Sequence, residues 1–367
     1  MTEIDSQLVV KCLSKDHDFI TIKDSWNAFV ETCQPEKLFY RHEWFEAMRK
    51  WHHGMCTPYV LLFYRNEKLI GICPLMSCQC RRGFISYRML GFIMIPASPY
   101  HDIICNQADL PIVLDAFGDY ITKNSSSWDI IVLKHMTKRT FTSLRHNDTL
   151  SGLPFKQSIT GSEYSSIVSL ESSWDNYYAQ RSKNVRKNNN NASNKLHKMG
   201  DATVSHYQID ALDAEKINTL ISEISVIADN SWKNGTVNNL SKPSGQKYLY
   251  NLFHQSKLNH GINLWILRLD NVAIAHEIQL IDNNDVYALH ADFHNNYERL
   301  SPGSYLNYYI IKALFNTEYT NYHMGPGGQR YKKAWENNEQ ELSQITYFAN
   351  SAKSKILQMQ NKIKPFL

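Results

Sequence analysis

The chain has 367 residues, more than the roughly 250 to 300 at which a single hydrophobic core stops growing, so we expect two domains. Its 43% hydrophobic and 20% charged residues, with a modest net charge of +4, are an ordinary globular mixture and exclude a disordered protein. No apolar run follows a basic N-terminus, and no stretch approaches the roughly 20 apolar residues that cross a bilayer. We therefore expect a soluble, cytoplasmic protein without a transmembrane segment.

Seven cysteines, an odd number, lie between Cys12 and Cys105. Their absence from the larger C-terminal part argues against a disulfide framework, so we expect reduced core thiols. Cys73, Cys78 and Cys80 are close in sequence, but they lack the paired C-x-x-C spacing of zinc sites. We predict no metal site.

The first half of the chain predicts an α/β unit. Strands at 60–65 and 68–76 flank the two-residue turn Asn66-Glu67, which is typical of a β-hairpin. Strands at 84–92, 101–106 and 128–136 and a helix at 110–122 follow. After a Pro-Ala-Ser-Pro turn, the side chains expected to face an acceptor substrate are Tyr100, His101 and Asp102.

A polar, turn-rich segment places the boundary between the domains near Ser151, giving domains of 1–150 and 151–367. Residues 174–199 are then predicted to form one long helix ending at Gly200. Six cationic residues and no acidic residue occupy 181–198: Arg181, Lys183, Arg186, Lys187, Lys195 and Lys198. This run indicates an anionic partner, with Arg186 and Lys187 as substrate-binding candidates, or else a solvated basic helix face.

The second half repeats the plan of the first. Helices at 214–232 and 243–257 precede strands at 264–269 and 272–280, which flank the turn Asp270-Asn271. A strand at 285–293 and a helix starting near Ser301 complete the pattern. Two similar α/β units in tandem explain this repetition.

The start of the Ser301 helix is a candidate anion site. Ser301 is predicted as the N-cap and Pro302 as the first helical residue. The N–H groups of Gly303, Ser304 and Tyr305 lack helical partners and can bind a phosphate. A later glycine cluster at 325–328 precedes further candidates for contacts with anionic groups, namely Arg330 and Lys332.

Several segments together resemble the cellulose-biosynthesis-type branch of the GNAT acyltransferase superfamily. They are RSKNVRKN, AIAHEIQL, DFHNNYERLSPGSYLNYYIIKALF and GPGGQRYKKAWEN, and SWNAFVETC, LFYRHEWFEAM and SPYHDIICN resemble the first unit of its tandem members. The resemblance implies an α/β (α+β) fold of two GNAT-like units, each a mixed, mostly antiparallel sheet flanked by helices. It also implies a thioester donor, acyl-CoA or an acyl carrier protein, bound to the second unit.

Two departures from the family pattern matter for that donor. The usual phosphate loop has a glutamine or arginine followed by glycines, and only part of it is kept from Arg299 to Ser304. In addition, Tyr322, His323 and Met324 stand where an aspartate is expected. The candidates for donor binding are Arg299, Ser301, Gly303 and Ser304, from the loop that the resemblance implies, and Arg330 and Lys332, from their position beside the glycine cluster.

The implied chemistry is attack of an amine on a thioester carbonyl. It requires a base for the ammonium proton, for which Asp292 and Glu277 are candidates. It also requires an acid for the departing thiolate, for which Tyr305 and Tyr331 are candidates. Alternatively, either carboxylate could have a structural, hydrogen-bonded role. Either tyrosine could likewise serve only in core packing.

Three functions therefore remain open. The first is an N-acyltransferase acting on a small-molecule amine or sugar acceptor, such as an envelope precursor. The second is a Fem-type peptidyltransferase that takes amino acids from aminoacyl-tRNA, with the basic helix contacting RNA. The third is a nonenzymatic binding protein that retains the fold.

Overall fold

The computed structural model describes residues 8–33, 37–52, 54–95, 98–147, 150, 156–255 and 258–363. The chain folds into two compact units, each built from segments that are distant in sequence. Unit 1 comprises Met1–Met94, Tyr100–Glu163 and Glu341–Leu367, and unit 2 comprises Ile95–Pro99 and Tyr164–Gln340. None of the helices in the described ranges reaches the length and apolar content that a bilayer crossing requires.

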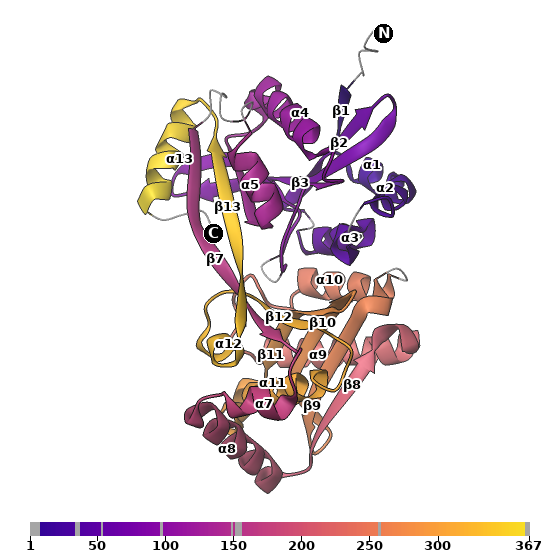
Figure 1. Cartoon of the computed structure of the whole chain (residues 1–367), viewed down its shortest axis with the longest axis vertical. Helices are drawn as coiled ribbons and strands as arrows, with labels where there is room; N and C mark the ends of the chain where they lie inside the picture. The colour runs from indigo at the N-terminus through magenta and orange to yellow at the C-terminus, as the bar shows by residue number, and fades with distance from the viewer. Residues whose placement is uncertain are drawn as a thin grey trace. The chain divides into compact units, whose positions relative to one another are not determined.

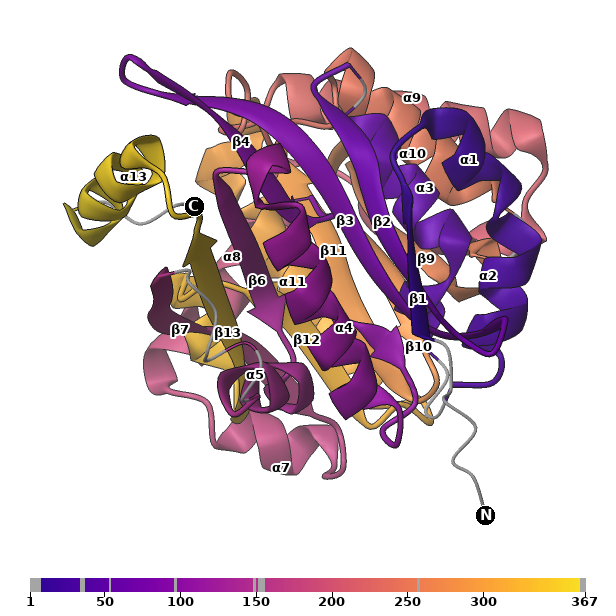
Figure 2. The same ribbon diagram turned by 90° about the horizontal axis from the view of Figure 1, so that it is seen from above.

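Unit 1 is a mostly antiparallel sheet of order β1-β2-β3-β4-β6-β13, with β5 beside β3 and one parallel pair, β4 and β6. Its strands are β1 Leu8–Leu13, β2 Cys56–Arg65, β3 Lys68–Arg82, β4 Ile85–Phe92, β5 Ile104–Cys105, β6 Ile130–Met136 and β13 Asn338–Phe348. Its helices are α1 Asp16–Thr21, α2 Lys23–Val30, η1 Leu38–Tyr40, α3 His42–Trp51, α4 Leu110–Lys123, η2 Ser125–Ser127, α5 Lys138–Arg145 and α13 Ala352–Ile363. Figure 2 shows α4 running across the strands of this unit, with α1, α2 and α3 grouped apart from it.

Unit 2 is likewise mostly antiparallel, with the order β7-β12-β11-β10-β9-β8 and the parallel pair β11 and β12 (Figure 1). Its strands are β7 Lys156–Ser169, β8 Ala202–Gln208, β9 Ile262–Leu269, β10 Val272–Asp282, β11 Asp285–Phe293 and β12 Asn321–Pro326. Its helices are α7 Trp174–Ala179, α8 Lys183–Met199, η3 Ile209–Ala211, α9 Ala214–Asp229, α10 Pro243–His254, η4 Asn259–Gly261, η5 Asn295–Leu300, α11 Pro302–Leu314 and α12 Arg330–Trp335. The predicted fold class, with helices flanking mixed sheets, is confirmed.

The two units follow the same path through their sheets. In unit 1 the β2–β3 hairpin leads through β4 and the crossover helix α4 to the parallel β6; in unit 2 the β9–β10 hairpin leads through β11 and α11 to the parallel β12. Both hairpin turns have two residues with positive φ: Asn66 and Glu67 at 50° and 65°, and Asp270 and Asn271 at 49° and 66°. Positive φ at both central positions matches the right-handed twist of the flanking strands.

Each sheet contains a strand that pairs with a partner far away in the sequence. In unit 1, β13 pairs with β6 in antiparallel register, from Ser343 opposite Met136 to Phe348 opposite Ile130. In unit 2, β7 pairs with β12, with Ser169 opposite Asn321. The units therefore differ from the predicted division near Ser151, because the ladder with β6 draws residues after Gln340 into unit 1.

The long helix predicted from residue 174 to Gly200 is wrong, since the structure breaks it into α7 and α8 (Figure 1). The side chain of Ser182 accepts a hydrogen bond from the Val185 N–H and begins a new helix there. A capping serine satisfies one of the free amides at a helix start, so it favours initiation over continuation. The predicted end at Gly200 is confirmed.

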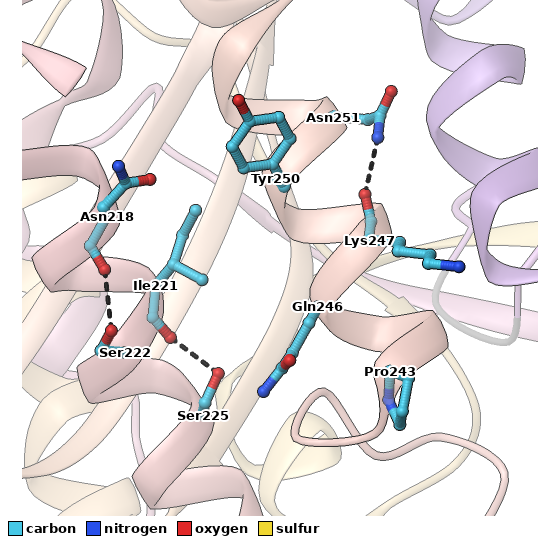
Figure 3. Close-up of a pocket in the computed structure, with 9 residues that line it drawn as sticks. All are labelled: Asn218, Ile221, Ser222, Ser225, Pro243, Gln246, Lys247, Tyr250 and Asn251. Carbon is cyan, nitrogen blue, oxygen red and sulfur yellow. Dashed lines mark hydrogen bonds between the residues drawn. The ribbon is translucent and has the colours of Figure 1, made fainter.

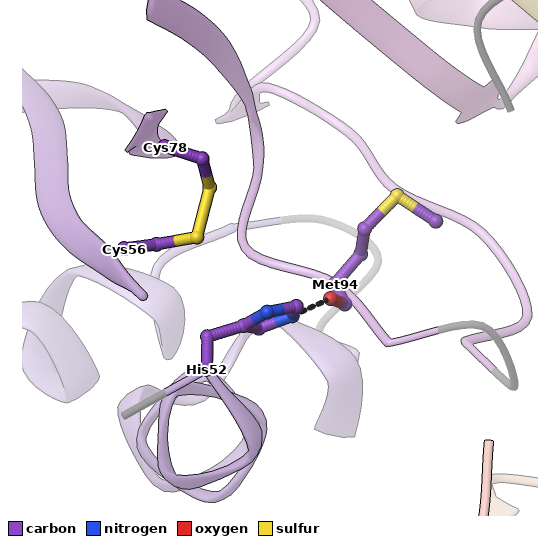
Figure 4. The surroundings of a disulfide bond; sticks show 4 residues. All are labelled: His52, Cys56, Cys78 and Met94. Carbon is purple, nitrogen blue, oxygen red and sulfur yellow. Dashed lines mark hydrogen bonds between the residues drawn. A yellow bond between two sulfur atoms is a disulfide. The ribbon is translucent and has the colours of Figure 1, made fainter. Parts of the chain in front are cut away.

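The expectation that all cysteines are reduced is also wrong. Cys56 on β2 lies opposite Cys78 on β3, with their Cα atoms 4.3 Å apart, and the two form a disulfide (Figure 4). The hairpin register creates this proximity, which the count of cysteines cannot reveal. Cys12, Cys73, Cys80 and Cys105 remain as thiols.

Candidate active site

The parallel strands of unit 2 separate part-way along their length. Backbone pairing joins Asp285, Val286 and Tyr287 of β11 to Asn321, Tyr322 and His323 of β12 and then ends. β11 continues to Phe293 with β10 on one side and, among the described residues, no paired strand on the other. Such an edge can hydrogen-bond an extended chain that carries amides.

A buried carboxylate lies beside this edge. Glu277 on β10 is 3% exposed and accepts hydrogen bonds from Tyr322 Oη at 2.6 Å and Gln279 Nε2 at 2.7 Å. Gln279 in turn accepts from Trp265 Nε1 at 2.9 Å, so the carboxylate is held by a connected network. Burial raises the pKa of Glu277, while the hydrogen bonds and the positive charge of Lys332 oppose this rise. A raised carboxyl pKa is nearer to what a general base needs at neutral pH.

The helix α12 brings Tyr331 and Lys332 close to Glu277. Desolvation and the negative charge of Glu277 raise the pKa of Tyr331, although the residue is 49% exposed, so this phenol holds its proton at neutral pH. Lys332 is buried and donates to the carbonyls of Gly325 at 3.1 Å and Pro326 at 2.7 Å. Lys332 thus fastens the glycine-rich loop, whereas Arg330 is exposed at the start of the helix.

The start of α11 has two free donors. Pro302 has no N–H, and the Tyr305 N–H donates to the Ser301 carbonyl at 3.1 Å. The N–H groups of Gly303 and Ser304 have no acceptor within the described part of the chain. A phosphate or carboxylate can take both, but the prediction that the Tyr305 N–H is also free is wrong.

The predicted capping role of the Ser301 side chain is wrong. Ser301 adopts a left-handed conformation, with φ 58° and ψ 49°, and its side chain makes no cap hydrogen bond. Capping side chains normally need an extended backbone at this position. The tight turn after η5, in which the Ser301 N–H donates to Glu298, imposes the left-handed conformation instead.

The free amides and Glu277 lie along one face of the β10–β11 ladder. Glu277 pairs with Ala291, and two residues further along the ladder Ala275 pairs with Phe293. An added Cβ at Gly303 would lie 3.2 Å from the Phe293 ring, so the helix start packs directly on that position. Two residues of a strand span about 7 Å, which sets the scale of the separation.

Asn307 is a residue that the sequence interpretation missed. It is 7% exposed, and its Oδ1 has no hydrogen-bond donor among the described residues. It follows Gly303 by four positions, so the two share a face of α11. An asparagine at a core-facing position of an otherwise apolar helix was the available signal.

Tyr305, the other candidate acid, is directed to a different neighbour. Its hydroxyl lies 3.5 Å from His197 Nε2 on α8. Burial raises its pKa. The structure thus joins Tyr305 to α8, while Tyr331 is the tyrosine close to Glu277.

Asp292 lies on the opposite face of the strands from Glu277. It pairs with His276, the neighbour of Glu277 on β10, and side chains of successive residues in a strand alternate between faces. Asp292 Oδ2 is 3.7 Å from Lys233 Nζ, and Lys233 also donates to the Ala291 carbonyl at 2.6 Å. Burial raises the pKa of Asp292, and the positive charge of Lys233 partly opposes this rise. The structure thus separates the two carboxylates that were candidates for one role.

His276 was also missed by the sequence interpretation. It is fully buried, and neither ring nitrogen has a hydrogen-bond partner among the described residues. Burial, aided by the charge of Lys233, lowers its pKa to about 3. The ring is therefore neutral at physiological pH.

His323 occupies the position where the family has an aspartate, and it contacts the carboxylate of Asp285. Its ring stacks on Tyr287 at 4.3 Å, and its Nε2 is 3.5 Å from Asp285 Oδ2. Although burial acts to raise it, hydrogen bonds from His323, Asn321 and Thr320 lower the pKa of Asp285 to about 2. This pair fixes the point where β11 and β12 begin.

The remaining cationic candidates of unit 2 lie at the surface, with Arg186 half-buried. Arg186 is on α8 and donates to the Ala179 carbonyl at 3.3 Å, and Lys187 is exposed beside it. Arg299 is exposed in η5, and its carbonyl accepts from Lys195 Nζ at 3.1 Å. No group of three or more His, Cys, Asp or Glu side chains in the described ranges is arranged to hold a metal ion.

The three candidates in unit 1 are buried in that unit. Asp102 accepts hydrogen bonds from Tyr40 at 3.0 Å, Thr137 at 3.1 Å and Arg139 at 3.3 Å, as well as from Thr140. His101 stacks on Phe92 with ring centroids 5.6 Å apart, and Tyr100 is 7% exposed. A buried carboxylate with this many hydrogen-bond donors indicates a structural role for Asp102 in unit 1.

A groove of about 610 Å³ lies between α9 and α10 of unit 2 (Figure 3). Ile221 and Ser225 from α9 face Gln246 and Tyr250 from α10 across it. None of the predicted site residues lines it.

Comparison with known proteins identifies the fold. A family model described as an acetyltransferase (GNAT) domain matches residues 183–333. This segment, which lies in unit 2, is therefore similar to a GNAT acetyltransferase domain. The GNAT match begins with α8 and ends within α12, so it includes Glu277, Gly303 and Tyr331.

Solved structures share the fold of this chain over most of its length. The crystal structure of FemX is 12% identical, covers 94% of this chain and 98% of its own, and superposes with a TM-score of 0.57. A conserved protein of unknown function from Bacteroides thetaiotaomicron is 10% identical over 93% of this chain and 100% of its own, with a TM-score of 0.54. No curated protein matches the sequence.

Proposed function

We propose that unit 2 transfers an acyl group from a thioester donor to an amine acceptor, as in an N-acyltransferase. The observation that carries this proposal is the shared face of β10 and β11. It presents the buried Glu277 carboxylate and, two ladder positions away, the free amides of Gly303 and Ser304. A base and an anion-binding helix start beside an unpaired strand edge are what a phosphate-bearing thioester requires.

The donor is held by backbone and by one amide side chain. The N–H groups of Gly303 and Ser304 bind its phosphate, with exposed Arg299 near the same turn. The free edge of β11 pairs with the amides of the pantetheine arm, and the unpartnered Oδ1 of Asn307 accepts from one of them. Lys332 keeps the loop at Gly325 in place.

In the transfer step, the neutral amine attacks the thioester carbonyl, the C–N bond forms and the C–S bond breaks. Glu277 accepts the proton that the attacking nitrogen loses as the C–N bond forms, and its raised pKa suits this role. Tyr331 donates its proton to the departing thiolate, since its own raised pKa keeps the phenol protonated until that moment. Tyr322 and Gln279 orient the carboxylate. The acceptor is a small-molecule amine, for which an amino sugar of an envelope precursor is our first choice.

The test compares two carboxylates on opposite faces of the same strands. Thiol release is measured with acyl-CoA and acyl-pantetheine donors and a panel of amines. Glu277→Gln should lower kcat/KM by about 10²- to 10⁴-fold, the usual contribution of a general base, and should remove the acidic limb of the pH profile. Asp292→Asn is the matched control and should keep the wild-type kcat/KM and the acidic limb of the pH profile. Equal losses in the two variants would remove Glu277 from the role of base.

A Fem-type transfer from aminoacyl-tRNA is the second candidate. The superposition with FemX and the basic helix α8 support it. It predicts that aminoacyl-tRNA is consumed in the presence of the amine acceptor, with a steep loss of rate as salt rises. Turnover with simple thioesters that is insensitive to salt would exclude it.

A further inference from the structure

Helix α8 carries an unpaired basic surface. No Asp or Glu occurs in residues 176–200, and Lys183, Lys187 and Lys198 are exposed and form no ion pair with any described residue. Its buried side consists of Asn189, Ala192 and Leu196. Isolated cations on a helix normally have acidic neighbours three or four positions away, which this helix lacks.

The three lysines form a stripe directly opposite the buried side. At 100° per residue, Lys183, Lys187 and Lys198 fall within about 60° of one another, and Asn194 falls between them. From the first to the last lysine the stripe is about 22 Å long at 1.5 Å per residue.

Helix α8 adjoins the proposed donor site through residues that flank the stripe. Lys195 of α8 donates to the Arg299 carbonyl at 3.1 Å, just before the turn that begins α11. His197, the residue before Lys198, has its Nε2 3.5 Å from the Tyr305 hydroxyl at the start of α11. A large anionic partner on α8 would therefore place its own attached groups next to the free amides.

The number of free amides at the start of α11 restricts how many phosphate groups of the thioester donor can be bound there. Only Gly303 and Ser304 offer a free N–H, because Pro302 has none and the Tyr305 N–H is taken by Ser301. Two donors suit a single phosphate group. The phosphopantetheine of a carrier protein has one phosphate, whereas coenzyme A has a diphosphate and a further phosphate on its ribose.

We propose that α8 is the docking surface for an acidic carrier protein, which delivers the acyl group on its phosphopantetheine arm to the α11 start. This proposal rests on the acyl transfer proposed above and names its donor. RNA fits the stripe less well, because residues 183–199 contain no Phe, Tyr or Trp on which bases could stack. Small, charge-dominated and transient interfaces suit a carrier that must bind and leave in each cycle.

The experiment uses the full chain and an acetylated acyl carrier protein from fatty-acid synthesis, with acetyl-pantetheine as the small donor. The variant Lys183→Glu/Lys187→Glu/Lys198→Glu reverses the stripe. It should weaken carrier binding and raise KM for the carrier by about tenfold or more, with kcat for acetyl-pantetheine unchanged. The matched control Lys15→Glu/Lys123→Glu/Lys138→Glu changes the net charge equally at exposed lysines of unit 1 and should leave both unchanged.

Each other outcome has one meaning. Equal KM values for the carrier in the wild type and the stripe variant would overturn the docking proposal, while turnover of acetyl-pantetheine would still support acyl transfer. Carrier binding that the stripe variant abolishes, without turnover of any thioester, would uphold docking and refute acyl transfer. Binding of total tRNA that the stripe variant abolishes, with no effect on the carrier, would overturn the proposal in favour of RNA.

Discussion

His276 should make the protein sensitive to acid. The ring is fully buried with a pKa of about 3, whereas an unfolded histidine has a pKa near 6.5. Between these two pH values the histidine is protonated in the unfolded state but neutral in the folded state. The free energy of unfolding is therefore highest above about pH 6.5 and falls as the pH decreases. At pH 5 the loss from this one residue is about 2 kcal/mol, from 1.5 pH units at 1.36 kcal/mol each.

The perturbation is His276→Leu, which keeps the side-chain volume and removes both unpartnered nitrogens. At pH 7.5 the free energy of unfolding should stay the same or rise by about 1 kcal/mol, because a buried polar group without a partner is removed. Between pH 7.5 and 5, the variant should lose about 2 kcal/mol less than the wild type.

The assay is urea unfolding followed by tryptophan fluorescence at both pH values. His17→Gln, at a side chain that is 85% exposed, is the control and should retain the wild-type pH dependence. The reasoning is refuted if His276→Leu keeps the full acid sensitivity. It is also refuted if the variant loses more than about 2 kcal/mol at pH 7.5, since that loss would mean the ring nitrogens are hydrogen-bonded.

Three further perturbations follow from the structure. Asp285→Asn should lower the free energy of unfolding by about 1–2 kcal/mol at pH 7. Because the pKa of Asp285 is lowered to about 2, this contribution is present above about pH 4 and disappears as the pH falls towards 2. Chemical denaturation at a series of pH values can follow the change. Asp102→Asn should destabilise unit 1 by about 1–3 kcal/mol because several donors lose a charged acceptor, and an unchanged urea midpoint would contradict this. Gly303→Trp should abolish donor binding in titration calorimetry, whereas Lys312→Trp, at an exposed position near the other end of α11, should not.

The sequence alone determined the local elements of this protein. The turns Asn66-Glu67 and Asp270-Asn271, the alternating strand at 285–293 and the helix beginning at Pro302 all appear where they were predicted. These features depend on turn chemistry and on periodicity over a few residues, which are encoded locally. The resemblance of the second half to the GNAT superfamily also came from the sequence.

The tertiary structure decided which strands pair and therefore which side chains meet. Glu277 and Asp292 were equivalent candidates until the β10–β11 register set Asp292 opposite His276 and left Glu277 on the other face with Tyr322. A shift of one residue in register would exchange the faces, and no local pattern fixes that register. The completion of each sheet by β7 or β13 and the Cys56–Cys78 bond arise in the same way, because long-range pairing is selected by the packing of the whole unit.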